Sequence, residues 1–200
     1  MSLNTSDPRQ IDLALRALDA RRSVPPKQLG EPAPSPDTLL RMLQSAVRVP
    51  DHGKRVPFRF LSFRGEARHA FGERLAARSR ERDPEASEAV FEKDRTRFSH
   101  APLVVAVIAR LGPDEKIPES ERFSTASCVC FALLQAAQAL GFAGIWLTGW
   151  LAYDAEVDRW LGLGEDERVV GYIHIGTPKL DAPERERPDP RELLTEWRPA

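Results

Sequence analysis

Apolar residues near the start of the chain recur at helical spacing. Residues 6–8 read Ser-Asp-Pro, which is typical of a helix start, because polar side chains cap free amides and proline is tolerated in the first turn. The helix is predicted to continue to about Arg21. One apolar face of this helix is formed by Ile11, Leu15 and Leu18.

The next segment is a proline-rich loop that leads into a second amphipathic helix. Residues 24–34 hold four prolines and one glycine, so this loop should be extended and stiff. Ser35 and Pro36 are typical of a helix start, and Pro50 ends the helix. The apolar stripe of this second helix is formed by Leu39, Leu40, Leu43, Ala46 and Val47.

Four short apolar runs predict strands, at residues 58–65, 101–110, 143–149 and 168–178. The run at 101–110 is continuous and rich in β-branched residues, so it should be buried on both faces of a sheet. The run at 168–178 should be the last core strand of the chain.

Four further segments predict helices. Residues 66–82 and 85–98 are charged and thinly apolar, which is typical of solvated faces or of mobile covers over a site. Residues 121–140 are apolar nearly all round, so they should form a long, central, buried helix, and Gly141 follows as its C-terminal glycine. A short helix is predicted over residues 154–161.

The order of these elements predicts one α+β domain over residues 1–200, with a sheet arranged around a buried helix. Strands and helices do not alternate regularly, so a Rossmann fold is not expected. After Pro178 the chain is charged and rich in proline, with apolar anchors only at Leu193, Leu194 and Trp197. We expect this extension, about residues 179–200, to lie over another surface, of its own chain or of a partner.

The composition restricts the classes of partner. Hydrophobic residues make up 42% of the 200 residues and charged residues 30%, which is ordinary for a globular protein. The net charge of -1 provides no overall field for nucleic acid or for an anionic membrane. The start of the chain is polar and no apolar run approaches the roughly 18 residues of a membrane span, so we expect a cytoplasmic protein.

The two cysteines, Cys128 and Cys130, fall in the apolar part of the long predicted helix. There they would lie about 200° apart around the helix axis, so they are not expected to bridge each other or to share a metal. We expect both to be buried, inert thiols in a reducing compartment.

Common catalytic signatures are missing from the sequence. It has no glycine-rich phosphate loop, no nucleophile elbow and no His-Glu-x-x-His motif. The four histidines are scattered without metal-ligand spacing, so no metal site is expected. His174 lies within a predicted strand and should be packed there, whereas His69 and His100 are expected at the surface.

Three short stretches remain as candidates for chemistry, and each has a structural alternative. Residues 21–23, Arg-Arg-Ser, suit phosphate oxygens, but cations at a helix end also stabilise the helix dipole. Residues 50–53, Pro-Asp-His-Gly, put a histidine on a turn that either reaches a ligand or is an ordinary turn. Residues 144–150 bracket a strand end with glycines, so either a flat ligand approaches the backbone near Thr148 or Trp146 packs in the core.

Taken in order, these pieces resemble the nitroreductase family of flavin enzymes, and within it the short, single-domain YdjA-like branch of NAD(P)H nitroreductases. The resemblance covers the chain from about Ile11 to Pro190. No single segment is specific, but the ordered set at this spacing is. The segments that carry the resemblance are residues 21–23, 31–60, 100–110, 141–149 and 169–179.

The resemblance implies an α+β fold with a central, mainly antiparallel sheet. It also implies an intertwined homodimer, in which the C-terminal extension wraps the partner subunit and FMN lies at the interface, held by residues of both subunits. The implied FMN contacts are Arg21, Arg22 and Ser23 for the phosphate and ribityl chain, His52 for the flavin, and Trp146, Leu147 and Thr148 for the isoalloxazine ring, partly through backbone groups.

The chain departs from the branch at one implied contact. Val56 stands where the branch commonly has glutamine, so a contact of this residue with FMN can only be apolar or through the backbone. The branch often adds a basic residue near the C-terminus for the phosphate, and Arg185 and Arg187 are both candidates. Residues 136–141 correspond to a segment suggested for the nicotinamide nucleotide, although here they read as the end of a core helix.

The function that the resemblance implies is that of an FMN-dependent NAD(P)H oxidoreductase. NAD(P)H and a flat acceptor, such as a nitroaromatic compound or a quinone, would use one open pocket in turn. The protein would bind, orient and tune the flavin, so no catalytic side chain is assigned and protons would come from solvent. The alternative is a flavin-binding protein without turnover, for storage or regulation, which the absence of glutamine at position 56 favours.

Overall fold

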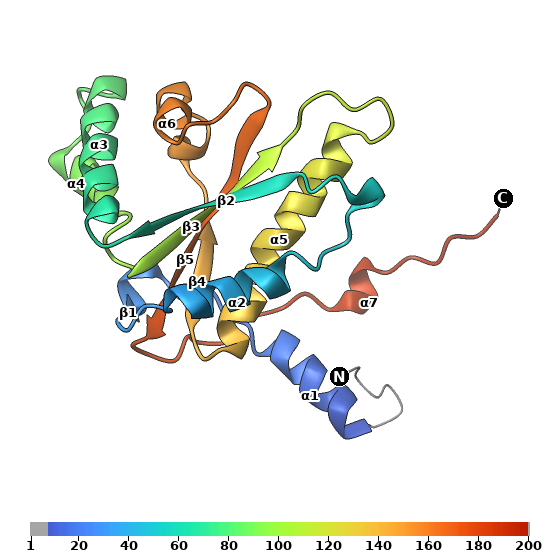
Figure 1. The fold of residues 1–200 in the computed structure, drawn as a ribbon. Coiled ribbons are helices and arrows are strands. Elements are labelled where there is room, and N and C mark those ends of the chain that lie inside the picture. Colours follow the sequence, from blue (N-terminus) through green and yellow to red (C-terminus); the bar gives the residue numbers. More distant parts are fainter. Residues whose placement is uncertain (1–7, 200) are drawn as a thin grey trace.

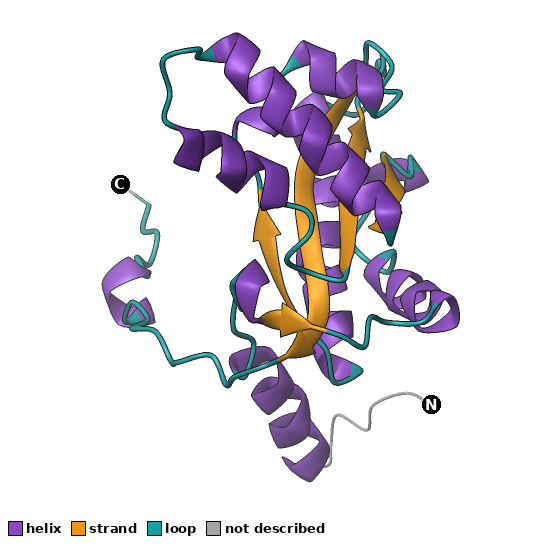
Figure 2. Ribbon diagram, turned by 90° about the vertical axis from the view of Figure 1, so that its left-hand side faces the viewer, coloured by secondary structure: helices purple, strands orange, loops and turns teal. Residues whose placement is uncertain are grey.

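The computed structural model describes residues 8–199, with helices on both sides of one sheet (Figures 1 and 2). The strands are β1 (Leu29–Gly30), β2 (Phe58–Arg64), β3 (Leu103–Arg110), β4 (Ala143–Leu147) and β5 (Glu167–Pro178). The α-helices are α1 (Pro8–Asp19), α2 (Pro36–Ala46), α3 (Glu66–Arg82), α4 (Glu88–Thr96), α5 (Glu119–Ala139), α6 (Ala155–Trp160) and α7 (Pro190–Leu193). Ser6 and Asp7, predicted to cap the first helix, lie outside the described residues.

The strands pair antiparallel throughout the sheet, as expected. They follow the order β2–β3–β5–β4, and β1 pairs with the last residues of β5. Leu103 of β3 pairs with Arg64 of β2 on one side and with Ile175 of β5 on the other. Among the described strands β4 pairs with β5 alone, so it lies at an edge of the sheet.

Side chains of β3 alternate between two hydrophobic layers, which explains its continuous apolar sequence. Val105 and Val107 point into the layer that α2 and α5 cover. Val104 and Ile108 point into the opposite layer, which α3 and α6 cover. All four side chains are fully buried, and each such burial stabilises the fold by roughly 1.5–3 kcal/mol. The predicted burial on both faces is confirmed.

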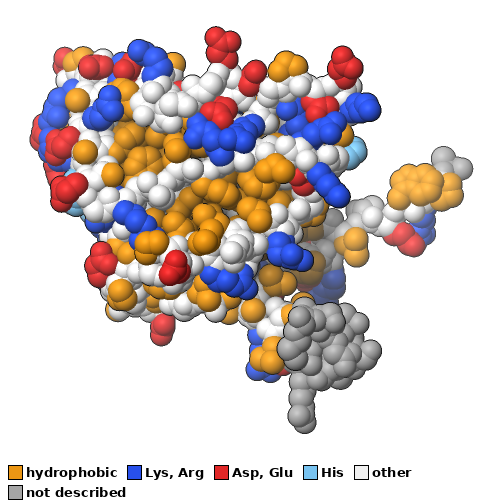
Figure 3. All heavy atoms as spheres, viewed as in Figure 1, with side chains coloured by type: hydrophobic (Ala, Val, Ile, Leu, Met, Phe, Trp, Pro, Cys, Tyr) orange, Lys and Arg blue, Asp and Glu red, His pale blue; other side chains and the backbone are white. Residues whose placement is uncertain are grey.

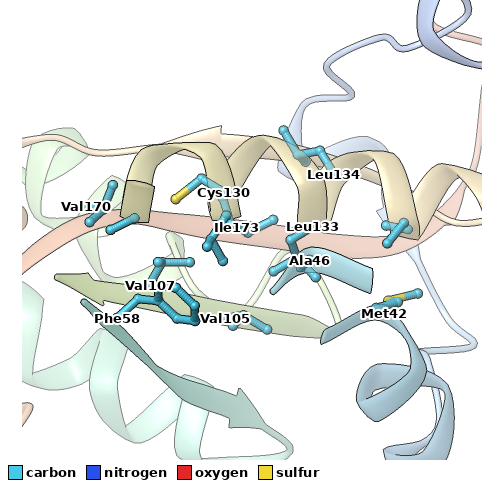
Figure 4. Close-up of a cluster of buried hydrophobic side chains, with 14 of the residues drawn as sticks. Met42, Ala46, Phe58, Val105, Val107, Cys130, Leu133, Leu134, Val170 and Ile173 are labelled. Atoms are coloured by element: carbon cyan, nitrogen blue, oxygen red, sulfur yellow. The ribbon is translucent and has the colours of Figure 1, made fainter. Parts of the chain in front are cut away.

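The longest helix, α5, packs along the sheet with one of its sides. Val129, Cys130 and Leu133 are fully buried in the first hydrophobic layer (Figure 4). Phe123 and Phe131 lie on the other side of α5 and remain 37% and 47% exposed. The predicted burial therefore holds for one side of this helix. None of the described helices, α5 included, is long and apolar enough to cross a membrane.

The two cysteines of α5 differ in exposure, so the prediction that both are buried was wrong for Cys128. Cys130 points into the core, and burial raises the pKa of its thiol far above the usual range. Cys128 is exposed because residues two apart on a helix point in nearly opposite directions. The angle of about 200° between the two side chains prevents a disulfide between them and also places Cys128 at the surface.

Two apolar segments project from the body of the molecule (Figures 1 and 2). The first is α1, whose predicted apolar residues Ile11, Leu15 and Leu18 are 43%, 53% and 51% exposed. The second is the extension after β5, which carries α7 and the exposed side chains of Leu194 and Trp197. These exposed side chains are not buried against the described part of their own chain, whereas Ala182 of the extension packs against a small buried cluster that contains Val24.

His174 is packed inside β5, as predicted, and is 1% exposed. Its ring lies beside that of Phe98, with the centroids 5.7 Å apart, and its Nδ1 has no hydrogen-bond partner in the described structure. Burial, with smaller contributions from Arg97 and His100, lowers the pKa of His174 from 6.5 to about 3. The folded protein therefore keeps His174 neutral at pH values where an unfolded chain protonates it.

The free energy of unfolding should decrease as the pH falls from 6.5 toward 3, because only the unfolded chain binds a proton at His174 in this window. The contribution of His174 to this loss should reach about 2 kcal/mol at pH 5. Urea unfolding at pH 7 and pH 5 should show a smaller loss in His174→Gln than in the parent. His69→Gln, at an exposed position of α3, is the control and should retain the parent's loss. Equal losses in the parent and His174→Gln would contradict this assignment.

Candidate functional site

The Arg-Arg-Ser segment lies directly beside the start of β4. Ser23 forms a parallel bridge with Gly144, and the Val24 amide donates to the Gly144 carbonyl at 3.1 Å. The backbone amide and carbonyl of Gly144 therefore point away from β5 and toward residues 23 and 24. Because alternate residues of a strand direct their amides and carbonyls to the same side, Trp146 and Thr148 do so as well. The free edge of β4 therefore offers backbone donors and acceptors next to a basic corner.

The two arginines of this corner have different surroundings. Arg22 pairs with Glu184 of the C-terminal extension and donates to the backbone carbonyls of Asp19 and Arg21. The Arg21 guanidinium donates only to the Ser23 hydroxyl, at 3.4 Å, and has no carboxylate partner among residues 8–199. Of the two side chains, Arg21 has the larger capacity left for an anion.

Two adjoining cavities include this corner. One, of about 450 Å³, is lined by both arginines, Gly144 and apolar side chains of α5 and the extension. The other, of about 530 Å³, is lined by the same arginines and by Glu184 and Arg187. Arg187 also pairs with Glu184 at 3.3 Å. Arg22 and Arg187 thus pair with one carboxylate, and Arg21 lines the same cavity without such a partner among the described residues, so the three guanidinium groups could bind a phosphate there.

The side chain of Trp146 packs into the core rather than along the free edge. Its indole lies against the backbone of Gly171, where an added Cβ would be only 1.9 Å from the indole Nε1. The indole N–H donates to the Val170 carbonyl at 3.3 Å. A flat ligand at the edge of β4 would therefore meet mainly backbone at this residue, together with half-buried Leu147 and exposed Thr148.

The turn that carries His52 is held to α5. It contains the short 3-10 helix η2 (His52–Lys54). The Thr125 hydroxyl donates to the Pro50 carbonyl at 3.2 Å, and the His52 Nδ1 lies 2.7 Å from the Glu121 carboxylate. His52 and these partners line a cavity of about 350 Å³ that exposed Cys128 also borders.

Val56 ends the same turn in an uncommon backbone conformation. Its φ is +48°, a region that β-branched residues rarely adopt. The Asp51 carboxylate holds this conformation by accepting the amides of Arg55 at 3.1 Å and Val56 at 2.8 Å. The Val56 side chain is 53% exposed and contacts no part of the Arg-Arg-Ser corner.

The predicted site residues thus form two separate groups within one chain. Arg21 lines a cavity with Gln138 near the C-terminal end of α5, whereas His52 contacts Glu121 near the N-terminal end. Glu121 and Gln138 are about 25 Å apart along the helix axis. Arg21, Arg22 and Ser23 lie beside the start of β4, the strand that leads on to residues 146–148. Neither His52 nor Val56 lines a cavity with these arginines.

Some side chains of the site carried no signal in the sequence. Glu184 lies in a charged extension with no periodic pattern, and only the folded chain brings it onto Arg22. Arg187 had been one of two basic candidates, and it is the one that shares a cavity with Arg21. Within the segment 136–141, Gln138 lines the same cavity as Arg21. The side-chain amide of Gln138 donates a hydrogen bond to the Ala17 carbonyl at 2.7 Å.

Comparison with known proteins agrees with the resemblance seen in the ordered segments. A model described as the Nitroreductase family matches residues 18–177. The chain is 35% identical over 185 residues to the Escherichia coli (strain K12) protein named "Putative NAD(P)H nitroreductase YdjA", covering 91% of this chain and 98% of that protein.

Solved structures share the fold. A nitroreductase-like family protein from Bacillus cereus superposes with a TM-score of 0.78 at 22% identity, over 92% of this chain and 95% of that one. A protein from Desulfovibrio desulfuricans described as a "putative nitroreductase" and solved in complex with FMN superposes with a TM-score of 0.72 at 22% identity, over 98% of this chain and 100% of that one. The expected fold is therefore confirmed, and the FMN contacts stay a prediction.

Proposed function

Because the chain belongs to the nitroreductase family, we propose that it is an FMN-dependent oxidoreductase that takes its electrons from NAD(P)H. A relative that matches nearly its whole length is named as an NAD(P)H nitroreductase, and a protein of the same fold was solved with FMN. We also propose a cytoplasmic location, a reducing compartment in which the two free thiols would persist.

The observation that carries the proposal is the bridge between Ser23 and Gly144. FMN is a flat ring joined by a polar ribityl chain to a phosphate, so it needs an anion site close to an open edge. Arg21 would hold the phosphate, with Arg187 as the basic residue of the extension. The edge of β4 would then bind the polar rim of the ring through the backbone of Trp146 and Thr148.

A second copy of the chain would complete the site. His52 and Val56 lie too far from Arg21 to share one FMN within a single chain, so we propose that they contact the FMN of the partner subunit. The apolar surfaces of α1, of α5 and of the extension after residue 178 would be buried in the same homodimer. Figure 3 shows hydrophobic side chains gathered over the middle of the face seen in Figure 1.

The chain would contribute binding and orientation rather than a catalytic side chain. Bound FMN would supply the redox chemistry, accepting a hydride from NAD(P)H and passing reducing equivalents to a flat acceptor such as a nitroaromatic compound or a quinone. Both substrates would occupy the same open pocket in turn. We assign no catalytic side chain, and protons would come from solvent.

A flavin-binding protein without turnover is the second candidate. The observation that favours it is Val56, which cannot donate a side-chain hydrogen bond and whose φ of +48° is strained. In that case the chain would store FMN or report its level. The two candidates share the cofactor and differ only in whether NAD(P)H reduces it.

Anaerobic titration separates these candidates. We expect added FMN to lose fluorescence on binding, and we expect NADH or NADPH to bleach the bound flavin. A panel of nitro compounds and quinones should then restore the flavin colour. Binding of FMN without bleaching by either nucleotide would leave only the storage or regulatory function. Unchanged fluorescence with FMN in excess would reject both candidates.

The phosphate role of the corner predicts the effect of Arg21→Ala combined with Ser23→Ala. Loss of this charge-assisted contact should weaken FMN binding by about 1.5–3 kcal/mol, while unfolding stays cooperative. Fluorescence titration measures the affinity. Arg16→Ala is the control, because this arginine of α1 is 74% exposed and pairs only with Asp12. Equal affinity in the double variant and the parent would refute the phosphate role.

The shared site predicts that Phe131→Asp gives a monomer that has lost FMN. A carboxylate on this side of α5 would be buried without a partner in the dimer, at a cost of about 3–5 kcal/mol. Sedimentation with absorbance detection follows the mass and the flavin together. Val90→Asp on α4, at a residue 42% exposed, should remain a dimer with FMN. A Phe131→Asp monomer that still holds FMN would contradict the shared site.

A further inference from the structure

The exit of β4 is held by a buried carboxylate from the charged hairpin of α3 and α4. Asp94 of α4 is 2% exposed. Its Oδ1 accepts from the Arg97 guanidinium at 2.7 Å and 3.2 Å. Its Oδ2 accepts the indole N–H of Trp150 at 3.1 Å. Each oxygen of Asp94 thus binds a group that flanks Gly149, the residue between β4 and the 3-10 helix η3 (Trp150–Ala152).

Gly149 itself fits tightly against this network. Its φ is +107°, a conformation that L-residues with a side chain rarely adopt. A Cβ at this position would lie 3.2 Å from the Arg97 Nη1. Because Asp94 engages the other two guanidinium nitrogens of Arg97, Nη1 is held facing the exposed turn at Thr148 and Gly149.

The same hairpin contacts the segment that follows β4, residues 149–154, at two further points. The Arg82 guanidinium lies over the Trp150 ring, 4.4 Å from its centroid. Asp154 accepts the Arg78 side chain at 3.2 Å and also caps α6 through the amides of Glu156 and Val157. The hairpin therefore contacts this segment at Trp150 and at Asp154, and Asp94 makes the contact nearest β4.

We propose that Asp94 is a positioning residue, which fixes the Thr148–Gly149 turn and with it the free edge of β4. This inference rests on the proposed function, since the edge matters for FMN only if FMN binds there. It gives the charged hairpin a role beyond that of a solvated face. Asp94 touches neither cofactor nor substrate in this role, and it acts through Trp150 and Arg97.

Two variants separate the parts of this role. Asp94→Asn weakens both contacts and leaves the charge of Arg97 uncompensated beside the turn. Trp150→Phe removes only the indole donor and keeps an aromatic ring under Arg82. Glu92→Gln is the matched control, because it makes the same change of charge on the same helix at an exposed residue that contacts only Arg95.

Hydrogen exchange without FMN tests the positioning directly. Amides of residues 147–152 should exchange faster in Asp94→Asn and in Trp150→Phe than in the parent, and Glu92→Gln should match the parent. Unchanged exchange in this segment would overturn the proposal, whether or not the protein binds FMN. If Asp94→Asn does not fold, Trp150→Phe alone decides this arm.

Flavin measurements then test the consequence for the site. The dissociation constant of FMN should rise roughly tenfold in Asp94→Asn, and less in Trp150→Phe. The reduction potential of bound FMN should move to more positive values in Asp94→Asn alone, because only this variant leaves a positive charge unpaired near the turn. Lower thermal stability with unchanged affinity and potential would mean a structural role and would overturn the proposal. A parent protein that binds no FMN would instead reject the proposed function, and the exchange result would still decide the positioning of the turn.

Discussion

The packing of α5 against the antiparallel sheet is the contact on which the rest of the molecule depends. One side of this helix forms the first hydrophobic layer with β3 and β5, so its position is set by close packing. The other side keeps Phe123 and Phe131 at the surface. Because the helix is long, its two ends carry separate parts of the site, with His52 at one and Arg21 at the other. A rigid α5 thus separates groups that the proposed FMN site would need together, which is the physical reason for proposing a second subunit.

Carboxylates hold turns on both sides of the sheet. Asp51 binds two amides of the turn that ends at Val56, and Asp154 caps α6 while it binds Arg78. Asp94 joins the hairpin of α3 and α4 to the exit of β4. A loop that is built this way loses little entropy on binding, because its conformation is already restricted. The candidate site offers mainly backbone groups of β4, so its geometry would depend on these carboxylate contacts.

Local chemistry made much of the fold predictable. The continuous β-branched run at 101–110, the Ser35 cap of α2 and the glycine after α5 are local features, and each lies where expected. The Arg-Arg-Ser segment was recognised as a phosphate candidate from its side chains alone. The exposure of Cys128 was missed, because composition does not tell which side of an apolar helix faces the sheet. Nor could Glu184 be matched to Arg22, since the two residues are 162 positions apart in the chain.

Local sequence specifies the helices, the strands and the kinds of chemical group available, because periodicity, capping and turn formation act between residues close in the chain. Which of those groups meet depends on the folded chain. It joined Ser23 to Gly144, turned the Trp146 indole into the core and set His52 a helix length away from Arg21. These outcomes depend on strand register and on the packing of α5, and both arise from contacts between residues far apart in the chain.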